Sequence, residues 1–112
     1  MILYFNPECS KCQEAYALIQ SHGKTVEVVD YLNQPPSIET LRDIVRVLGI
    51  APKELIRKKE ILFLENYEGK TFSDEEWLKI LSDNPILLER PIVIEGNRAI
   101  IGRPPKKVLE LF

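Results

Sequence analysis

Hydrophobic positions along the chain follow two periods, which predict short strands and short helices in turn. Residues 2–5 form a continuous apolar run that is typical of a short buried strand. Residues 10–21 have helical character and are closed by Gly23, and residues 25–29 alternate as a β-branched second strand does. A strand, a helix and a strand within about 30 residues make a βαβ unit, in which we expect parallel strands and a right-handed connection.

The middle of the chain predicts a succession of helices. Ser37 is a typical N-cap for a helix over about residues 38–48, which carries apolar side chains at helical spacing and ends before Gly49. Ser73 and Glu76 form a capping box that opens a helix extending to about residue 82. Shorter helical segments are expected at residues 52–55, at residues 60–67, and from Asn84 and Pro85 to about residue 89.

The end of the chain returns to strands. Residues 91–94 and 99–101 are short apolar segments joined around Gly96 and Asn97, which is a hairpin signal, and a last helix is expected over residues 106–111. The predicted order is therefore β-α-β, a mostly helical middle, then β-β-α. One mixed sheet with helices on its faces fits this order, so the fold class is α/β.

Composition limits the classes of function. The chain has 112 residues, the size of one domain, with 45% hydrophobic residues, 29% charged residues and a net charge of −2. This charge does not favour direct binding to nucleic acid or to a membrane surface. No apolar run approaches the roughly 18 residues of a membrane span, and no basic stretch precedes an apolar one as in a signal peptide. We expect a cytoplasmic protein.

Cys9 and Cys12 form a Cys-x-x-Cys motif at the point where the first strand turns into the first helix. The unsatisfied N–H groups and the dipole of a helix N-terminus favour a thiolate at Cys9, and the thiolate is the nucleophilic form. Cys12 lies one turn further, where it is either a resolving thiol or a small core residue. Two thiols and one distant His22 cannot supply the four ligands of a zinc site, so we expect no metal. The motif on an opening βαβ unit suggests a thioredoxin-like domain.

Six further motifs follow one another along the chain. They are Asn6-Pro7-x-Cys9, Tyr31-Leu32-x-x-Pro35-Pro36, Leu55-Ile56-Arg57-Lys58, Asn84-Pro85-Ile86-Leu87, Glu89-Arg90-Pro91-Ile92-Val93 and Gly102-Arg103-Pro104. Their order and spacing resemble those of the glutaredoxin-linked arsenate reductase (ArsC) family. The resemblance implies a thioredoxin-like fold, here a single domain of residues 1–112 with a helical insertion at about residues 37–89.

The resemblance also implies a site and a reaction. In the reductases of this family a single cysteine thiolate attacks arsenate, three arginines bind the oxyanion, and glutathione and glutaredoxin complete the reduction. Matched by motif, Cys9 is the nucleophile and the oxyanion ligands are Arg57, Arg90 and Arg103. A guanidinium can pair two hydrogen bonds with a tetrahedral oxyanion, and its charge lowers a neighbouring thiol pKa. The resemblance thus implies an oxidoreductase without a bound cofactor, with glutathione as co-substrate and glutaredoxin or thioredoxin as electron donor.

Other residues near the site are expected to be structural. Asn6 and Pro7 shape the loop before the cysteine, and the resemblance implies a cis peptide bond before Pro91, against the cysteine. Arg57 belongs to a basic triplet that could also be a solvated surface, and Arg103 could also cap a neighbouring helix. We expect a monomer.

Two departures from the family pattern keep a second function open. The family's established reductases usually carry a histidine where this chain has Phe5, and they generally lack a cysteine at the position of Cys12. A Cys-x-x-Cys is closer to the redox-switch regulators of the Spx type, which toggle a disulfide and bind RNA polymerase. The alternative is therefore a regulator with a Cys9–Cys12 disulfide and a protein partner, in which no small molecule turns over.

Overall fold

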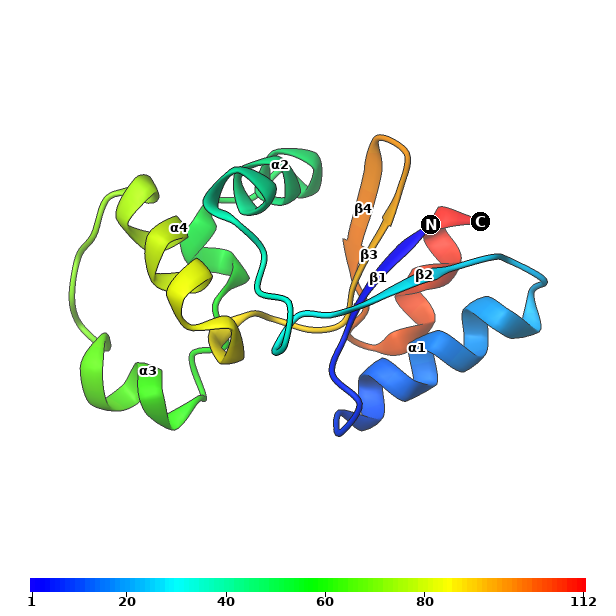
Figure 1. The fold of residues 1–112 in the computed structure, drawn as a ribbon, viewed down its shortest axis with the longest axis horizontal. Helices are drawn as coiled ribbons and strands as arrows, with labels where there is room; N and C mark the ends of the chain where they lie inside the picture. The colour runs from blue at the N-terminus through cyan, green and yellow to red at the C-terminus, as the bar shows by residue number, and fades with distance from the viewer. The chain divides into compact units, whose positions relative to one another are not determined.

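The structure is a computed structural model that describes all residues from 1 to 112. The chain divides into two compact units (Figure 1). The first, called here the sheet unit, consists of Met1–Gln34 and Arg90–Phe112; the second, the helical unit, is Pro35–Glu89. No helix is long and apolar enough to cross a membrane.

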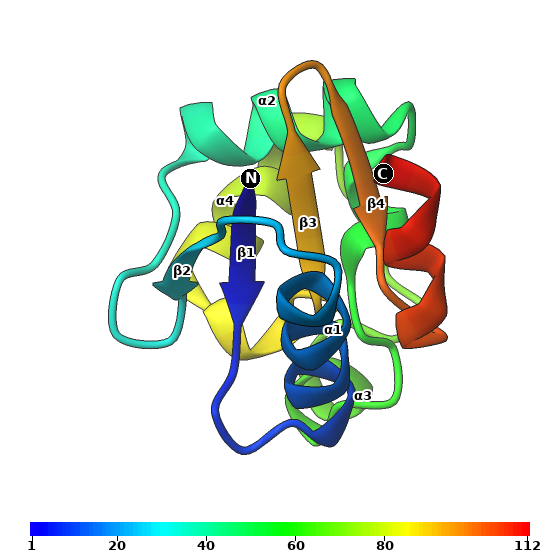
Figure 2. The ribbon, with the colours of Figure 1, turned by 90° about the vertical axis from the view of Figure 1, so that its right-hand side faces the viewer.

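The sheet unit contains one mixed sheet of four strands. The strands are β1 (Ile2–Phe5), β2 (Glu27–Asp30), β3 (Ile92–Glu95) and β4 (Arg98–Ile101). Their order across the sheet is β2-β1-β3-β4 (Figure 2), with β1 and β2 parallel and the other neighbours antiparallel. The predicted parallel pair, the hairpin around Gly96 and the α/β fold class are confirmed.

Two helices pack on the same face of this sheet. They are α1 (Ser10–Ser21) and the 3-10 helix η3 (Pro105–Leu111), which contact each other along their lengths (Figure 2). Leu3 and Val93 point from adjacent strands toward these helices, because alternate residues of a strand face opposite sides of the sheet. They form the core of the unit together with Ala15, Ile19, Val108 and Leu111. The buried side of α1 thereby fixes how the helix start, with its cysteine pair, meets the end of β1.

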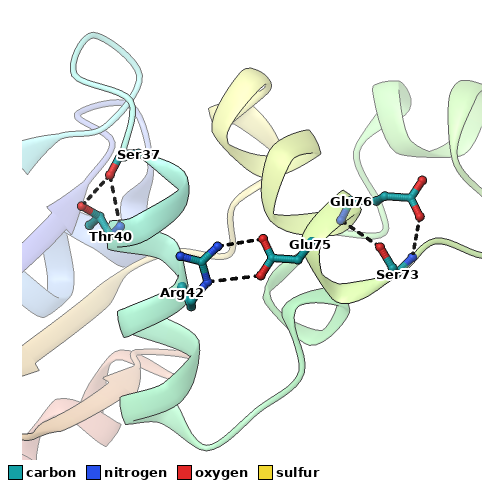
Figure 3. Close-up of polar contacts among 6 residues, drawn as sticks. All are labelled: Ser37, Thr40, Arg42, Ser73, Glu75 and Glu76. Atoms are coloured by element: carbon teal, nitrogen blue, oxygen red, sulfur yellow. Dashed lines mark hydrogen bonds and ion pairs between the residues drawn. The ribbon is translucent and has the colours of Figure 1, made fainter.

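The helical unit consists of short helices joined by Pro and Gly turns. They are α2 (Ile38–Leu48), η1 (Pro52–Leu55), α3 (Ile61–Asn66), α4 (Asp74–Asp83) and η2 (Pro85–Leu87). Figure 3 shows the two N-caps that the sequence predicts, with the Ser37 hydroxyl accepting from the Thr40 N–H and Ser73 and Glu76 bonded reciprocally. In the same view Arg42 of α2 makes two hydrogen bonds to Glu75 of α4. Local capping therefore starts both long helices where the sequence predicts.

Several elements differ from the prediction in their bounds or type. The segment predicted to be helical from residue 84 to about residue 89 is a 3-10 helix of Pro85–Leu87 only. The second strand begins at Glu27 instead of residue 25, because the parallel register pairs Glu27 with Ile2, the first residue of β1. The last helix begins at Pro105 and is a 3-10 helix, in which the Lys107 N–H donates to the Pro104 carbonyl three residues back.

Candidate active site

Cys9 is the N-cap of α1 and is 8% exposed. A short loop joins it to β1, and this loop is held by its own hydrogen bonds. The Cys9 N–H donates to the Asn6 carbonyl at 3.0 Å, the Asn6 side-chain oxygen accepts from the Glu8 N–H at 3.0 Å, and Gln13 Nε2 donates to the Pro7 carbonyl at 2.6 Å. Asn6 and Pro7 thus order the loop, and the sulfur lies at the helix start with little freedom to move.

The surroundings of the Cys9 sulfur favour its ionised form. Burial raises the pKa of this thiol, but hydrogen bonds outweigh burial and leave the pKa below its ordinary value. They come from the backbone N–H and the thiol of Cys12, from the Arg90 guanidinium and from the backbone N–H of Lys11. Backbone N–H groups of the first helical turn have no partner within the helix, so they are available to a thiolate.

Cys12 differs from Cys9 although it lies on the same helix. It is fully buried on the core side of α1, and burial raises the pKa of its thiol to about 12. A hydrogen bond from the Asn6 backbone lowers this value in part, while the nearby charge of Cys9 raises it further. Both cysteines are free thiols, so the pair consists of one thiol biased toward ionisation and one held protonated.

Arg103 lies beside the Cys9 sulfur. Its Nη2 donates to Cys9 Sγ at 3.7 Å, and its Nε donates to the carbonyl of Arg90 at 2.7 Å. The chain reaches this position after β4, where the Gly102 N–H donates to the Pro91 carbonyl at 2.8 Å. A Cβ at Gly102 would lie 2.9 Å from Pro91 Cγ, so this close approach requires glycine. The Arg103 guanidinium therefore donates to the cysteine and to the Arg90 backbone, and these nitrogens are not used to cap a neighbouring helix.

The Arg90–Pro91 peptide bond is cis, as the motif predicts, and the Arg103–Pro104 bond is cis as well. The Arg90 guanidinium carries two buried nitrogens, Nε and Nη1, that have no hydrogen-bond partner. A buried donor without an acceptor costs about 1–3 kcal/mol, and more when it is charged. Nε and Nη1 of Arg90 are thus donors near Cys9 that no protein atom accepts in normal geometry.

Tyr31 is a site residue that the sequence analysis did not assign. Its side chain is 1% exposed, and its hydroxyl lies against Asn6 and Arg90 without a hydrogen bond of normal geometry. Burial raises the pKa of Tyr31 to about 12, and the Arg90 charge offsets this in part. Tyr31 lies near Asn6 through the strand register, since β1 and β2 pair Phe5 with Asp30 and the following residues are Asn6 and Tyr31.

Arg57 belongs to the helical unit. Its backbone N–H donates to the Leu87 carbonyl at 2.7 Å, beside an isolated bridge between Ile56 and Leu88. Its side chain is 21% exposed, with Nε 3.8 Å from Glu89 Oε1 and a buried Nη1 that has no partner. Lys58 and Lys59 of the same basic triplet are exposed.

The structure thus gathers Cys9, Cys12, Arg90 and Arg103 in the sheet unit and holds Arg57 in the helical unit. A family model described as the ArsC family matches residues 4–111. The chain belongs to the ArsC family. It is 44% identical to the uncharacterized protein YfgD of Escherichia coli K12, over 97% of this chain and 93% of that protein. It is 39% identical to the arsenate reductase of Haemophilus influenzae, over 100% of this chain and 98% of that protein.

A solved structure extends this similarity to the fold. The arsenate reductase from Vibrio cholerae is 37% identical to this ArsC-family protein, with a TM-score of 0.95 over 99% of this chain and 96% of that one. The fold is thioredoxin-like, as the motifs predict.

Proposed function

We propose that this ArsC-family protein is a thiol-dependent arsenate reductase in which the Cys9 thiolate attacks the oxyanion. One observation carries the proposal: Arg103 donates to the Cys9 sulfur while Arg90, beside it, holds two buried guanidinium nitrogens without an acceptor. Arsenate oxygens would accept hydrogen bonds from these nitrogens while arsenic lies next to the Cys9 sulfur. Relatives named arsenate reductase support the choice of oxyanion.

The first step forms a sulfur–arsenic bond. The Cys9 thiolate attacks arsenic, the bond from arsenic to one hydroxyl group breaks, and the departing hydroxyl takes up a proton from solvent and leaves as water. Arsenic stays As(V) in this step. Arg90 and Arg103 hold the remaining oxygens through charge-assisted hydrogen bonds, which strengthen as charge develops on them. We propose Arg57 as a third oxyanion ligand on its sequence motif alone.

The second step transfers electrons to arsenic. A second thiol attacks the Cys9 sulfur, a disulfide bond forms, and the sulfur–arsenic bond breaks with its electron pair left on arsenic. Arsenic becomes As(III) and leaves as arsenite with the proton of the attacking thiol. We propose glutathione as this thiol, with glutaredoxin or thioredoxin reducing the resulting mixed disulfide in a reducing cytoplasm. Cys12 is the alternative attacking thiol, and its raised pKa, about 12, keeps it protonated at neutral pH.

Steady-state reduction of arsenate by the protein with glutathione and glutaredoxin tests this function. We expect turnover by the wild type and by Arg42→Ala, a matched control on an exposed arginine of the helical unit. Cys9→Ser should abolish turnover, because a hydroxyl does not provide a thiolate. Absence of arsenite formation by the wild type would overturn the proposal.

The same assay with Cys12→Ser decides what resolves the adduct. If glutathione is the attacking thiol, Cys12→Ser should retain turnover. Mass spectrometry after mild peroxide gives an independent reading: a loss of two hydrogens in the wild type only reports a Cys9–Cys12 disulfide. That disulfide together with no turnover of arsenate would favour a redox-switch protein instead.

A further inference from the structure

The Tyr31 hydroxyl is a buried polar group that makes no hydrogen bond of normal geometry. The Tyr31 side chain is 1% exposed, and its oxygen is buried without a partner. A buried polar group without a partner destabilises a protein, and an apolar group of the same shape can remove this penalty. Phenylalanine differs from tyrosine only by this oxygen, so the stability of the fold does not explain the hydroxyl.

Tyr31 lies at the end of the sheet where the loop to the nucleophile begins. The first two strands are parallel, with Phe5 paired to Asp30 at their ends. The residues that follow, Asn6 and Tyr31, therefore leave the same end of the sheet. Asn6 in turn orders the loop, because its carbonyl accepts from the Cys9 N–H at 3.0 Å. Tyr31 is thus next to the residue that fixes the backbone of the nucleophile.

Two side-chain donors face the Tyr31 oxygen. The Asn6 amide and the Arg90 guanidinium both lower the Tyr31 pKa, as donors to the ionised oxygen do. The Asn6 side-chain oxygen already accepts from the Glu8 N–H, so the amide nitrogen is the atom that is left to face Tyr31. Hydrogen bonds of an active site are often poorly aligned before substrate binds and tighten with it. The Tyr31 oxygen is therefore placed to accept from both side chains.

The Arg90 guanidinium links this oxygen to the nucleophile. The same side chain donates to the Cys9 sulfur, and its Nε and Nη1 are buried. Its backbone is held, since the Arg90 carbonyl accepts from Arg103 Nε at 2.7 Å. A long arginine side chain has many rotamers, and a contact that restricts them keeps its donors directed at the sulfur.

A hydroxyl oxygen suits this position better than a carboxylate would. A carboxylate would bind the guanidinium more strongly, but its negative charge would raise the pKa of a neighbouring thiol and repel an oxyanion. A neutral acceptor restricts the side chain and leaves its positive charge available to both. Burial raises the pKa of Tyr31 to about 12, so the hydroxyl stays neutral at physiological pH.

We propose that Tyr31 is a positioning residue whose hydroxyl oxygen holds the Arg90 guanidinium against the Cys9 sulfur. The assignment deepens the proposed function, on which it rests for the roles of Cys9 and Arg90. Tyr31 keeps its proton throughout and touches neither the sulfur nor the oxyanion. Its effect on the thiolate therefore passes through Arg90.

A double-mutant cycle on the pKa of Cys9 tests this role without arsenate. Iodoacetamide labelling of the full chain across pH, followed by mass spectrometry of each cysteine, gives the pKa as the midpoint of the rate profile. Tyr31→Phe keeps the ring and removes the oxygen, so it should raise the midpoint by about 0.5–1 pH unit, the scale of one hydrogen bond. In the Arg90→Ala protein the same change should leave the midpoint where it is, because the group through which Tyr31 acts is absent.

Tyr4→Phe is the matched control. Tyr4 is a buried tyrosine of the same sheet, 8% exposed, and burial and the charge of Glu27 raise its pKa. Glu27 is paired with Ile2 at the end of the sheet opposite to the nucleophile loop, so the Tyr4 hydroxyl is directed away from Cys9. Tyr4→Phe should therefore leave the Cys9 midpoint unchanged.

An unchanged Cys9 midpoint in Tyr31→Phe would overturn the proposal. An equal rise with and without Arg90 would also overturn it, because Tyr31 would then act through packing or on the sulfur itself. A rise in Tyr4→Phe as large as in Tyr31→Phe would do the same. A failed arsenate assay beside the expected result of the cycle would overturn the proposed function alone, and arsenate turnover beside an unchanged midpoint would overturn only the role of Tyr31.

Discussion

Arginines in the two units of the molecule differ in how their donors are paired. Arg42 in the helical unit forms two hydrogen bonds with Glu75, at 3.2 and 2.7 Å, and both side chains are exposed. In the sheet unit, Arg103 donates to a sulfur, and Arg90 holds two buried nitrogens with no acceptor at all. The exposed Arg42 has a carboxylate partner, whereas two buried nitrogens of Arg90 have no partner.

The difference separates a structural role from a functional one. An exposed ion pair exchanges water for a partner of similar strength, so it contributes little to stability. Buried guanidinium nitrogens without an acceptor destabilise the empty protein and gain strongly from an anion. The arginines around Cys9 therefore lower the stability of the empty protein and favour the binding of an anion.

The largest expected effect is on anion binding. Arg90→Ala and Arg103→Ala should each weaken arsenate binding by about 1.5–3 kcal/mol, the scale of a hydrogen bond to a charged group. Isothermal titration of the Cys9→Ser protein, which cannot react, measures this Kd. Arg103→Lys keeps the charge but loses the planar donors, so it should recover only part of the affinity. An unchanged Kd in either alanine variant would remove that arginine from the oxyanion site.

The next effect is a loss of stability at high pH that originates in the sheet unit. Burial raises the pKa values of Cys12 and Tyr31 to about 12, so the folded state keeps protons that the unfolded state releases. Their contribution is complete below the unfolded-state values and is lost as pH rises from about 9 toward about 12. The lowered pKa of Cys9 contributes stability that is complete once pH exceeds the ordinary thiol value, so it does not oppose the loss in the upper part of this window.

Urea unfolding across this alkaline range measures how steeply the free energy of unfolding falls with pH. Tyr31→Phe and Cys12→Ala should each reduce the dependence of the unfolding free energy on pH, because each removes one of the groups that titrates. A variant with the same slope as the wild type would show that its residue ionises as easily in the folded state as in the unfolded one.

A smaller effect concerns how Cys12 supports Cys9. The thiol of Cys12 donates to the Cys9 sulfur, so Cys12→Ala should raise the pKa of Cys9, while Cys12→Ser, which keeps a donor, should raise it less. Ultraviolet absorbance of the thiolate during a pH titration reports the change. If both variants shift the pKa equally, the effect comes from packing and not from the hydrogen bond.

The smallest effect is expected in the helical unit. Arg42→Ala and Glu75→Ala remove the exposed pair, and neither should measurably alter arsenate binding or the pKa of Cys9. Denaturant unfolding should show little change in stability, and less at high salt, because salt screens exposed charges. A marked loss of arsenate binding in Arg42→Ala would contradict the assignment of Arg42 to a purely structural pair.

Features that depend on neighbouring residues were predictable from the sequence. The apolar run before Cys9, the helix behind it and the capping box of Ser73 with Glu76 all involve residues at most four apart, and each forms as expected. The site residues Cys9, Arg90 and Arg103 came from motif order, and the structure groups them in the sheet unit. Their roles in binding and reaction stay predictions.

Features that depend on register and on packing between distant segments were not predictable. Tyr31 lies beside Asn6 only because β1 and β2 pair in one particular register. The packing of α1 against η3 joins segments that lie far apart in the sequence, at Ser10–Ser21 and Pro105–Leu111. The start of β2 and the 3-10 form of the last helix likewise follow from pairing and from hydrogen bonds that no local pattern specifies.

The pH dependence of Cys9 alkylation tests the central claim most directly. Iodoacetamide labelling of the wild type, followed by mass spectrometry of each cysteine, gives the pKa of Cys9 as the midpoint of its rate profile. We predict a midpoint below the free value of about 8.5, with Cys12 labelled far more slowly, and a higher midpoint in Arg103→Ala but not in Arg42→Ala. A Cys9 midpoint at or above about 8.5, or faster labelling of Cys12 at neutral pH, would contradict the account.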